Sequence, residues 1–381
     1  MRVFSFRFSL SLFCLLFMFC AEAKTQAPGI AAKSWVLVEF VSGQFLAGEK
    51  IDEPLEPASL TKLMTAYLSF SALQQKTLTR EQSVLVSENA WRTGMGGSRT
   101  FLQAGRKATI DDLLKGMIVQ SGNDAAVVLA EAIAGSEEAF AAQMNREAKR
   151  LGMNHTRFKN ATGLPDAEHF TTARDLATLA TALLRDFPEE YARYYAIREF
   201  SYNNIRQKNR NILLGQAETG VDGMKTGYTE AAGWCLIASA LRGERRLLAI
   251  VLGAASDAAR ASESLKLLNW GYQFFDAVKL YEAGQAISEF KVWKGSRGKV
   301  KAGFQSDFIL SIPRDARSKL TATLLSRQPL LAPVRKGQII GILKFSLEGE
   351  TYGEYPVESL EDVPLGNWFY RFIDTLRLWF A

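Results

Sequence analysis

The stretch Pro57-Ala58-Ser59-Leu60-Thr61-Lys62 opens a predicted helix whose apolar residues continue from Leu60 to Leu68. At the first turn of a helix, residues three positions apart share a face, so the Lys62 amine can reach the Ser59 hydroxyl. If burial and a second lysine lower the pKa of Lys62, its neutral amine can take the proton from Ser59 as that oxygen attacks a substrate. Taken alone, the pair is better explained by a helix-capping serine followed by an exposed lysine.

A second motif, Ser121-Gly122-Asn123, lies between two predicted helices. A short loop at this position can direct both polar side chains into a cleft. Ser121 can then relay a proton to a leaving amine, while Asn123 can hold Lys62 and a substrate amide. In isolation this motif, too, is typical of an ordinary helix-capping loop.

The third motif, Lys225-Thr226-Gly227, lies on a predicted strand and occurs once in the chain. Lys225 can supply positive charge, Thr226 a hydroxyl for a carboxylate, and Gly227 room for a substrate backbone to pair with the strand. Each motif is weak by itself, but together and in this order they supply a nucleophile, a base, a second proton carrier and a cationic clamp.

Strands at both ends of residues 24–281 enclose a mainly helical region, from about residue 59 to 187. This order predicts one antiparallel sheet carrying a helical insert, which is an α+β arrangement. A further helix is predicted at Arg260 to Phe275. The strands are predicted at Ser34 to Val41, Phe45 to Glu49, Gly223 to Tyr228, Trp234 to Ala240 and Leu247 to Gly253.

Residues 282–361 differ in texture, since short alternating runs such as Gln338 to Leu347 and Thr351 to Val357 predict a small all-β domain. Five basic residues in this domain favour a solvated edge strand over a binding patch. They are Lys291, Lys294, Arg297, Lys299 and Lys301.

The C-terminal residues 362–381 predict an amphipathic helix. The segment is too short and too polar to span a bilayer, but it suits lying in a membrane interface. The alternative is a terminal helix docked on the protein's own core. The apolar face holds Trp368, Phe369, Phe372, Ile373, Leu376, Trp379 and Phe380, and the opposite face Asn367, Arg371, Asp374 and Thr375.

The first 23 residues are typical of an export signal. Two arginines precede the apolar run Leu10 to Phe19, and Ala21-Glu22-Ala23 provides the small residues that signal peptidase requires. We expect the mature chain to begin at Lys24, with an uncleaved anchor helix as the alternative.

Composition limits the remaining function classes. The chain has 381 residues, of which 48% are hydrophobic and 23% charged, and its net charge is +6. It contains no basic block interleaved with aromatic residues. We therefore expect no nucleic-acid partner. His155 and His169 are the two histidines, and no cysteine pair has the spacing of metal ligands, so we expect no metal and no cofactor. Cys235, the only cysteine beyond residue 23, is expected to be a small core residue.

With the three motifs in this order, the chain resembles the low-molecular-mass penicillin-binding proteins, serine-type D-Ala-D-Ala carboxypeptidases of peptidoglycan. The resemblance covers nearly the whole chain. It implies a five-stranded antiparallel sheet with a helical subdomain, then the all-β domain and the terminal helix. Further matching stretches are Asn160-Ala161-Thr162-Gly163-Leu164-Pro165-Asp166, Thr172-Ala173-Arg174-Asp175 and Arg260-Ala261-Ser262-Glu263-Ser264.

The resemblance implies that Ser59 forms an acyl-enzyme with release of the terminal D-alanine of a stem pentapeptide, after which water frees the shortened peptide. Penicillins and other β-lactams would bind covalently as inhibitors. Arg260, with Thr226, would receive the terminal carboxylate. Backbone N–H groups of Ser59 and Tyr228 would form an oxyanion hole, each worth ~3 kcal/mol of transition-state stabilisation. Tyr228 is a departure, because relatives often have histidine there.

The resemblance also implies export to the periplasmic side of the bacterial inner membrane, with peripheral attachment through the C-terminal helix.

Three alternative functions stay open. A serine β-lactamase needs a glutamate and a water for rapid deacylation, and the setting of Glu168 does not match that arrangement. A non-enzymatic penicillin-binding scaffold or sensor would not need the proton path. A DD-endopeptidase would use the same chemistry on cross-links.

Overall fold

A five-stranded antiparallel sheet forms the centre of the first domain, in the order β2-β1-β9-β8-β7. The computed structural model describes residues 26–326 and 328–379, so the predicted signal peptide and Phe380 lie outside the described residues. The predicted α+β class with five antiparallel strands is confirmed. The strands are β1 (Ser34–Glu39), β2 (Phe45–Glu49), β7 (Val221–Thr229), β8 (Gly233–Arg242) and β9 (Arg245–Ala254).

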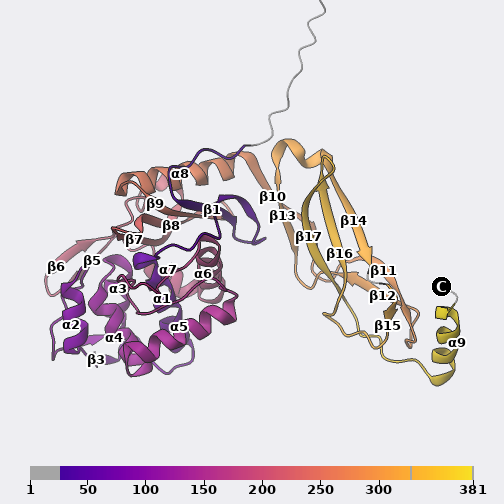
Figure 1. The fold of residues 1–381 in the computed structure, drawn as a ribbon, viewed down its shortest axis with the longest axis horizontal. Helices are drawn as coiled ribbons and strands as arrows, with labels where there is room; N and C mark the ends of the chain where they lie inside the picture. The colour runs from indigo at the N-terminus through magenta and orange to yellow at the C-terminus, as the bar shows by residue number, and fades with distance from the viewer. Residues whose placement is uncertain (1–25, 327, 380–381) are drawn as a thin grey trace, which may run out of the picture.

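Both faces of this sheet are buried, because alternate residues of each strand point to opposite sides. Val36 and Ile250 pack into the larger core with the helical region, whereas Leu37 and Val251 pack on α8. Figure 1 shows α8 along one face of the sheet and the other helices gathered beneath the opposite face. Cys235 of β8 is a free, fully buried thiol, as predicted.

The helical region is less continuous than the sequence predicts. A two-stranded antiparallel sheet of β3 with β4 interrupts it, and the hairpin of β5 with β6 follows it. Helix α8 begins at Asp257, three residues before the predicted start, because the Ser256 hydroxyl accepts from the backbone N–H of Ala259.

The predicted cap at Thr172 is present, since its hydroxyl accepts from the N–H of Asp175. The helices are α1 (Lys62–Gln74), α2 (Glu88–Met95), α3 (Ile110–Val119), α4 (Asn123–Ala134), α5 (Glu137–Leu151), α6 (Ala173–Asp186), α7 (Pro188–Tyr194) and α8 (Asp257–Phe274). The 3-10 turns are η1 (Ala58–Thr61), η2 (Ala217–Thr219) and η3 (Arg314–Lys319). The strands of the two small sheets are β3 (Ser83–Leu85), β4 (Lys107–Thr109), β5 (Glu199–Tyr202) and β6 (Ile205–Lys208).

The second domain is all-β, as predicted. A six-stranded sheet has the order β14-β16-β17-β12-β11-β15, and β10 pairs with β13 beside it. Strand β10 ends at Tyr281, so it lies before the boundary that the sequence prediction places between residues 281 and 282. The strands are β10 (Phe275–Tyr281), β11 (Ala286–Trp293), β12 (Lys299–Gly303), β13 (Phe308–Pro313), β14 (Leu320–Ser326), β15 (Leu330–Leu331), β16 (Ile339–Leu347) and β17 (Glu350–Ser359).

The basic segment of this domain is not an edge strand, contrary to the sequence prediction. Strand β12 lies between β17 and β11, and β11 has the short parallel strand β15 on its other side. Two of its cations are paired instead on the surface: Lys299 with Glu289, and Arg297 with Glu361.

Helix α9 (Trp368–Trp379) lies at the end of the β-rich domain that is remote from the first domain (Figure 1). None of its described residues is buried, so the described part of the helix is not docked on the protein's own core. It is attached to the domain by its polar side, where the Asp374 carboxylate accepts from the backbone N–H of Lys294. Within the described residues, no helix is both long and apolar enough to cross a bilayer.

Candidate active site

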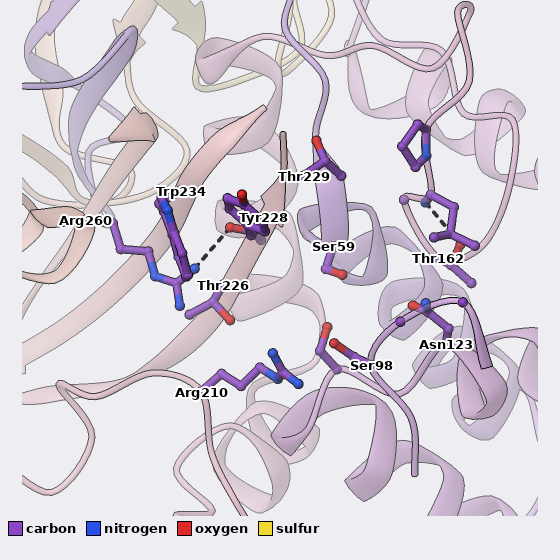
Figure 2. Close-up of a pocket in the computed structure, with 17 residues that line it drawn as sticks. Ser59, Ser98, Asn123, Thr162, Arg210, Thr226, Tyr228, Thr229, Trp234 and Arg260 are labelled. Carbon is purple, nitrogen blue, oxygen red and sulfur yellow. Dashed lines mark hydrogen bonds between the residues drawn. The ribbon is translucent and has the colours of Figure 1, made fainter. Parts of the chain in front are cut away.

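The three motifs meet at one cleft of about 470 Å³ in the first domain. Ser59 comes from η1, Ser121 and Asn123 from the turn between α3 and α4, and Thr226 from β7; all four line the cleft. Figure 2 shows the side chains of Ser59, Asn123 and Thr226 facing a common space. Residues that are about 60 to 170 positions apart in the sequence therefore line the same cleft.

Lys62 lies directly behind Ser59 and is only 1% exposed. Its Nζ donates to Ser59 Oγ at 2.9 Å, to Asn123 Oδ1 at 2.8 Å and to the Thr162 carbonyl at 2.6 Å. Three acceptors match the three N–H groups of a charged ammonium. In the neutral amine, two N–H groups suffice for Asn123 and Thr162, and the lone pair is then directed at the Ser59 hydroxyl.

The pKa of Lys62 favours that neutral state. Burial, reinforced by the positive charge of Arg210, lowers this pKa to about 7, while Asp124 and Glu137 act in the opposite direction. The sequence prediction named a second lysine as the nearby cation; Lys225 does interact with Lys62, and the structure adds Arg210, which the sequence did not predict.

The loop after α5 packs tightly against the nucleophile turn. Gly163 has a φ of +81°, and a Cβ added there would lie 1.8 Å from the Ala58 carbonyl oxygen. From the same loop, buried His169 forms a 3.0 Å hydrogen bond with the hydroxyl of Thr61, the residue directly before Lys62. Burial lowers the pKa of His169 to about 4, so the ring is neutral near pH 7 and serves as a support.

Ser121 is poised without a partner in the described structure. Its Oγ is buried and forms no hydrogen bond, and its φ of +66° is unusual for a residue with a side chain. Ala58, next to Ser59, also has a positive φ, of +46°. Such backbone strain is concentrated at functional sites because the surrounding structure must enforce it.

Lys225 is buried in β7 behind the cleft wall, where its Nζ donates to the Thr226 carbonyl at 3.0 Å. Burial lowers the pKa of this amine well below its ordinary value, and the charges of Lys62, Arg210 and Arg260 add to the effect. Thr226 itself lines the cleft. Because β7 is the last strand of the sheet, its outer edge is free to pair with an extended peptide.

The space that Gly227 leaves is filled by the nucleophile turn rather than held open for substrate. A Cβ at this position would lie 3.2 Å from Ala58 Cβ, from the Pro57 carbonyl oxygen and from the Ser59 backbone nitrogen. Glycine therefore allows β7 to approach η1, which brings the third motif close to the nucleophile.

Tyr228 and Arg260 both line the cleft, as does Trp234, which the sequence analysis did not select. The Tyr228 side chain is 50% exposed and rests on Trp234, with ring centroids 4.3 Å apart. Arg260 Nη1 donates to the Gly227 carbonyl at 3.0 Å, and its Nη2 pairs with Asp257. Its guanidinium also stacks on Trp234, 5.0 Å from the ring centroid.

Several cleft residues were not predicted as site residues, among them Arg210, Ser98, Thr229 and Trp234. Arg210 follows the β5–β6 hairpin, and nothing in the local sequence distinguishes it from a surface arginine. Only the folded chain brings it to the cleft wall (Figure 2).

No group of histidine, cysteine, aspartate or glutamate side chains within residues 26–326 and 328–379 is arranged to hold a metal ion. Glu168, weighed above as a deacylating residue, is half-exposed and pairs with Arg157 and Lys159; it does not line the cleft.

A serine hydroxyl bonded to a buried lysine of lowered pKa, on a five-stranded sheet with a helical insert, defines a serine acyl-transfer enzyme of the transpeptidase type. Comparison with known protein families identifies the family within this class. Residues 21–256 match the family model of D-alanyl-D-alanine carboxypeptidase, and residues 275–365 match that of the penicillin-binding protein 5 C-terminal domain. The chain belongs to the D-alanyl-D-alanine carboxypeptidase family.

Individual relatives extend over nearly the full length. The chain is 42% identical to D-alanyl-D-alanine carboxypeptidase DacC of Escherichia coli strain K12, over 95% of this chain and 92% of that protein. The structure of penicillin binding protein 5 from Haemophilus influenzae has a TM-score of 0.83 and 38% identity, covering 89% of this chain and all but 1% of that one. Penicillin-binding protein D2 from Listeria monocytogenes, in its ampicillin-bound form, matches 65% of this chain and 99% of its own, with 30% identity and a TM-score of 0.57.

Proposed function

We propose that this serine-type D-Ala-D-Ala carboxypeptidase acts on peptidoglycan stem pentapeptides through an acyl-enzyme at Ser59. The observation that carries this proposal is the 2.9 Å hydrogen bond between Ser59 Oγ and the buried amine of Lys62. It joins a nucleophile to a base whose pKa, about 7, suits proton transfer at neutral pH.

In the acylation step, neutral Lys62 takes the proton from Ser59 while Oγ attacks the carbonyl carbon of the penultimate D-alanine. The backbone N–H groups of Ser59 and Tyr228 would stabilise the resulting oxyanion. Because Gly227 lets β7 pack closely on η1, these two donors belong to segments in direct contact.

Collapse of the tetrahedral intermediate breaks the bond to the terminal D-alanine, whose amine needs a proton. Ser121 is the relay we propose, because its buried hydroxyl has no competing partner in the described structure and lines the same cleft as Ser59. The proton passes from Lys62 through Ser121 to the leaving amine. Water then attacks the ester, and the shortened peptide is released.

Asn123 orients the base, since its side-chain oxygen accepts from Lys62 at 2.8 Å. The open edge of β7 holds the peptide backbone, and Thr226 with Arg260 receives its terminal carboxylate. Lys225 lies behind this wall, where its Nζ donates to the Thr226 carbonyl, and a bound carboxylate would favour its charged form. A β-lactam carries a carboxylate and a strained amide, so it would enter the same cleft and acylate Ser59, in keeping with the ampicillin-bound relative.

The placement of Glu168 disfavours the β-lactamase alternative. Rapid deacylation needs a carboxylate beside the acyl ester, whereas Glu168 is engaged by Arg157 and Lys159 outside the cleft.

We also propose that the protein is exported and attached to the outer surface of the cytoplasmic membrane by α9. Five large apolar side chains of this helix are 41% to 79% exposed, which suits insertion into the lipid interface. They are Trp368, Phe369, Phe372, Leu376 and Trp379.

The adjoining end of the β-rich domain extends this surface. Exposed Leu365 and Leu331 flank the segment that carries Lys294: Leu365 bridges to Gly295, and Leu331 pairs with Trp293. Lys294 is therefore placed to meet anionic headgroups beside the helix.

The test is incubation of the purified protein with a muropeptide pentapeptide, followed by mass analysis of the products. We expect loss of one D-alanine, and expect Ser59→Ala to abolish both this release and covalent labelling by penicillin, by ~10⁴-fold or more. A Ser59→Ala protein that still accepts penicillin covalently would place the nucleophile elsewhere.

A further inference from the structure

One wall of the cleft is a tight turn, from Asn160 to Leu164, whose Thr162 carbonyl accepts from the Lys62 amine at 2.6 Å. Figure 2 shows Thr162 across the cleft from Thr226. The other two groups bonded to this amine, the Ser59 hydroxyl and the Asn123 amide, belong to side chains. The Thr162 acceptor belongs to the main chain, so its direction is set by the conformation of the turn.

The side chain of Asn160 holds this turn from within. Its Oδ1 accepts from the backbone N–H of Gly163 at 2.7 Å, from the N–H of Thr162 at 3.2 Å and from the Thr162 hydroxyl at 3.0 Å. Its Nδ2 donates to the Leu164 carbonyl at 3.0 Å. One side chain thus accepts three hydrogen bonds and donates a fourth within the turn that it begins.

The Gly163 N–H and the Thr162 carbonyl belong to the same peptide group, which therefore joins Asn160 to Lys62. In a trans peptide group, the N–H and the C=O point in opposite directions. The Asn160 oxygen on the N–H side thus directs the carbonyl at Lys62 on the other side. The bond to the N–H also polarises the carbonyl, which strengthens its hydrogen bond with the amine.

Without Asn160, this peptide group would be free to turn over. Gly163 has a φ of +81°, and a glycine changes between backbone conformations at low steric cost. The reversed peptide group would present its N–H to Lys62 in place of the carbonyl. The amine would then lose one of its acceptors and face a donor instead.

The rest of the turn is held by other residues. The Ala161 N–H donates to the Glu137 carboxylate at 3.0 Å, and the Ala161 carbonyl accepts from the Thr65 hydroxyl at 2.7 Å. These bonds fix the two peptide groups that precede the one in contact with Lys62. The orientation of that last group is left to Asn160.

We propose that Asn160 is a positioning residue for the catalytic base, which holds the Thr162–Gly163 peptide group so that the lone pair of Lys62 stays directed at Ser59. The neutral amine has two N–H groups, one for Asn123 and one for this carbonyl, and losing either acceptor lets it rotate about its Cε–Nζ bond. Asn160 does not line the cleft, so it acts through the peptide group alone. The inference rests on the proposed acyl-enzyme mechanism.

The carbonyl also influences the protonation of Lys62, because a hydrogen-bond acceptor favours the ammonium form. Losing it should move the acid limb of acylation to lower pH while the plateau rate falls. A change at Asn160 leaves in place the charged and titratable groups that act on Lys62 from the surrounding elements. These are Arg210 after β6, Asp124 of α4, Glu137 of α5, Lys225 of β7 and His169 of the same loop.

The experiment follows acylation of the mature protein by penicillin in stopped flow across pH, with D-alanine release from a pentapeptide measured in parallel. Asn160→Leu keeps the size of the side chain and removes its polar atoms. The plateau rate at saturating penicillin should fall ~10–100-fold, because misplacing a reacting group by about 1 Å has effects of this size. The acid limb should move to lower pH, and the noncovalent affinity for penicillin should change little.

Asn160→Asp is the conservative variant, since it keeps an oxygen that can accept from the Gly163 N–H. It should recover most of the plateau rate. Its negative charge favours the ammonium form of Lys62, so its acid limb should move to higher pH, opposite to that of Asn160→Leu. Asn154→Leu, the same change at an exposed asparagine in the turn after α5, is the matched control and should behave as wild type.

The fraction of each variant that penicillin labels at completion reports how much of it is folded. An unchanged plateau rate in Asn160→Leu would overturn the proposal, as would an equal loss of rate in Asn160→Leu and Asn160→Asp. A smaller labelled fraction with the wild-type rate and acid limb would indicate a purely structural role and would also overturn it.

If Asn160→Leu does not fold, Asn160→Asp decides the matter, because a large loss of plateau rate or an unmoved acid limb in that variant contradicts the proposal. Failure of the proposed carboxypeptidase function is a separate result. It would appear as a wild-type protein that penicillin acylates but that releases no D-alanine.

Discussion

The cleft and helix α9 both reverse the usual pattern of burial, the cleft by burying polar side chains and α9 by exposing apolar ones. In the cleft, Lys62, Lys225 and Ser121 are polar and at most 3% exposed, whereas on α9 large apolar side chains reach 79% exposure. Burying a cation and exposing an aromatic side chain are both unfavourable in the isolated chain. We therefore propose that each region is completed by what binds to it, a carboxylate-bearing peptide in one case and lipid in the other.

The two regions also differ in how firmly they are held. Lys62 has three hydrogen-bond acceptors and sits beside strained residues, so a change of one atom should alter the reaction rate. Helix α9 is attached through few contacts, such as that of Asp374 with the Lys294 N–H, and its binding should depend on summed apolar area. Changes in one region should then leave the function of the other intact.

The largest expected effect is at Lys62. Lys62→Met removes the base and keeps an unbranched side chain, so acylation by penicillin and D-alanine release should both fall ~10²–10⁴-fold. Binding to vesicles should not change. The measurements are stopped-flow acylation and vesicle sedimentation, with Lys208→Met, an exposed lysine of β6, as the control. Acylation within about tenfold of wild type would show that the proton goes to another base.

The next effect concerns α9. Deleting residues 368–381 should lower the fraction bound to anionic vesicles ~10-fold or more, because it removes the apolar face, while D-alanine release from a soluble pentapeptide stays at the wild-type rate. Vesicle sedimentation and product analysis measure the two outcomes. Thr375→Ser, on the polar side, is the control. Sedimentation of the truncated chain to the wild-type extent would contradict the anchor.

The candidate site residues could be predicted from the sequence where the chemistry requires particular residue types at a fixed spacing. Ser59 and Lys62 must lie three positions apart to share a helix turn, and Lys225 with Thr226 must lie on a strand. Similar local rules predicted much of the fold. Alternation of apolar and polar residues indicated the strands of the sheet, and the Thr172 cap indicated the start of α6. The hairpin β5–β6 was missed because its strands are only four residues long.

Arg210 and Glu137 could not be predicted, for a different reason. Arg210 reaches the cleft only because Asn211 ties its loop to β7, a contact between segments that have no pattern in common. Glu137 reads as a common acidic residue at a helix start, and its influence on Lys62 depends on where α5 packs. Long-range electrostatics within the site is a property of the assembled chain.

The smallest expected effect tests that electrostatic control. Since a protonated Lys62 cannot accept the Ser59 proton, the acylation rate of the wild-type protein should decline as pH falls through about 7. Glu137 raises the pKa of Lys62 by favouring its charged form, so Glu137→Gln should lower that pKa and move the acid limb to lower pH.

At pH 6 the Glu137→Gln protein should therefore acylate ~2–3-fold faster relative to its own plateau than wild type does. The glutamine can still accept from the Ala161 N–H, as Glu137 does at 3.0 Å, so the loop beside Lys62 is retained. Glu138→Gln changes the same charge at the exposed neighbouring position and should leave the profile unmoved. An acid limb that shifts upward, or one that both variants shift equally, would mean that the cleft is not tuned by the carboxylate at the start of α5.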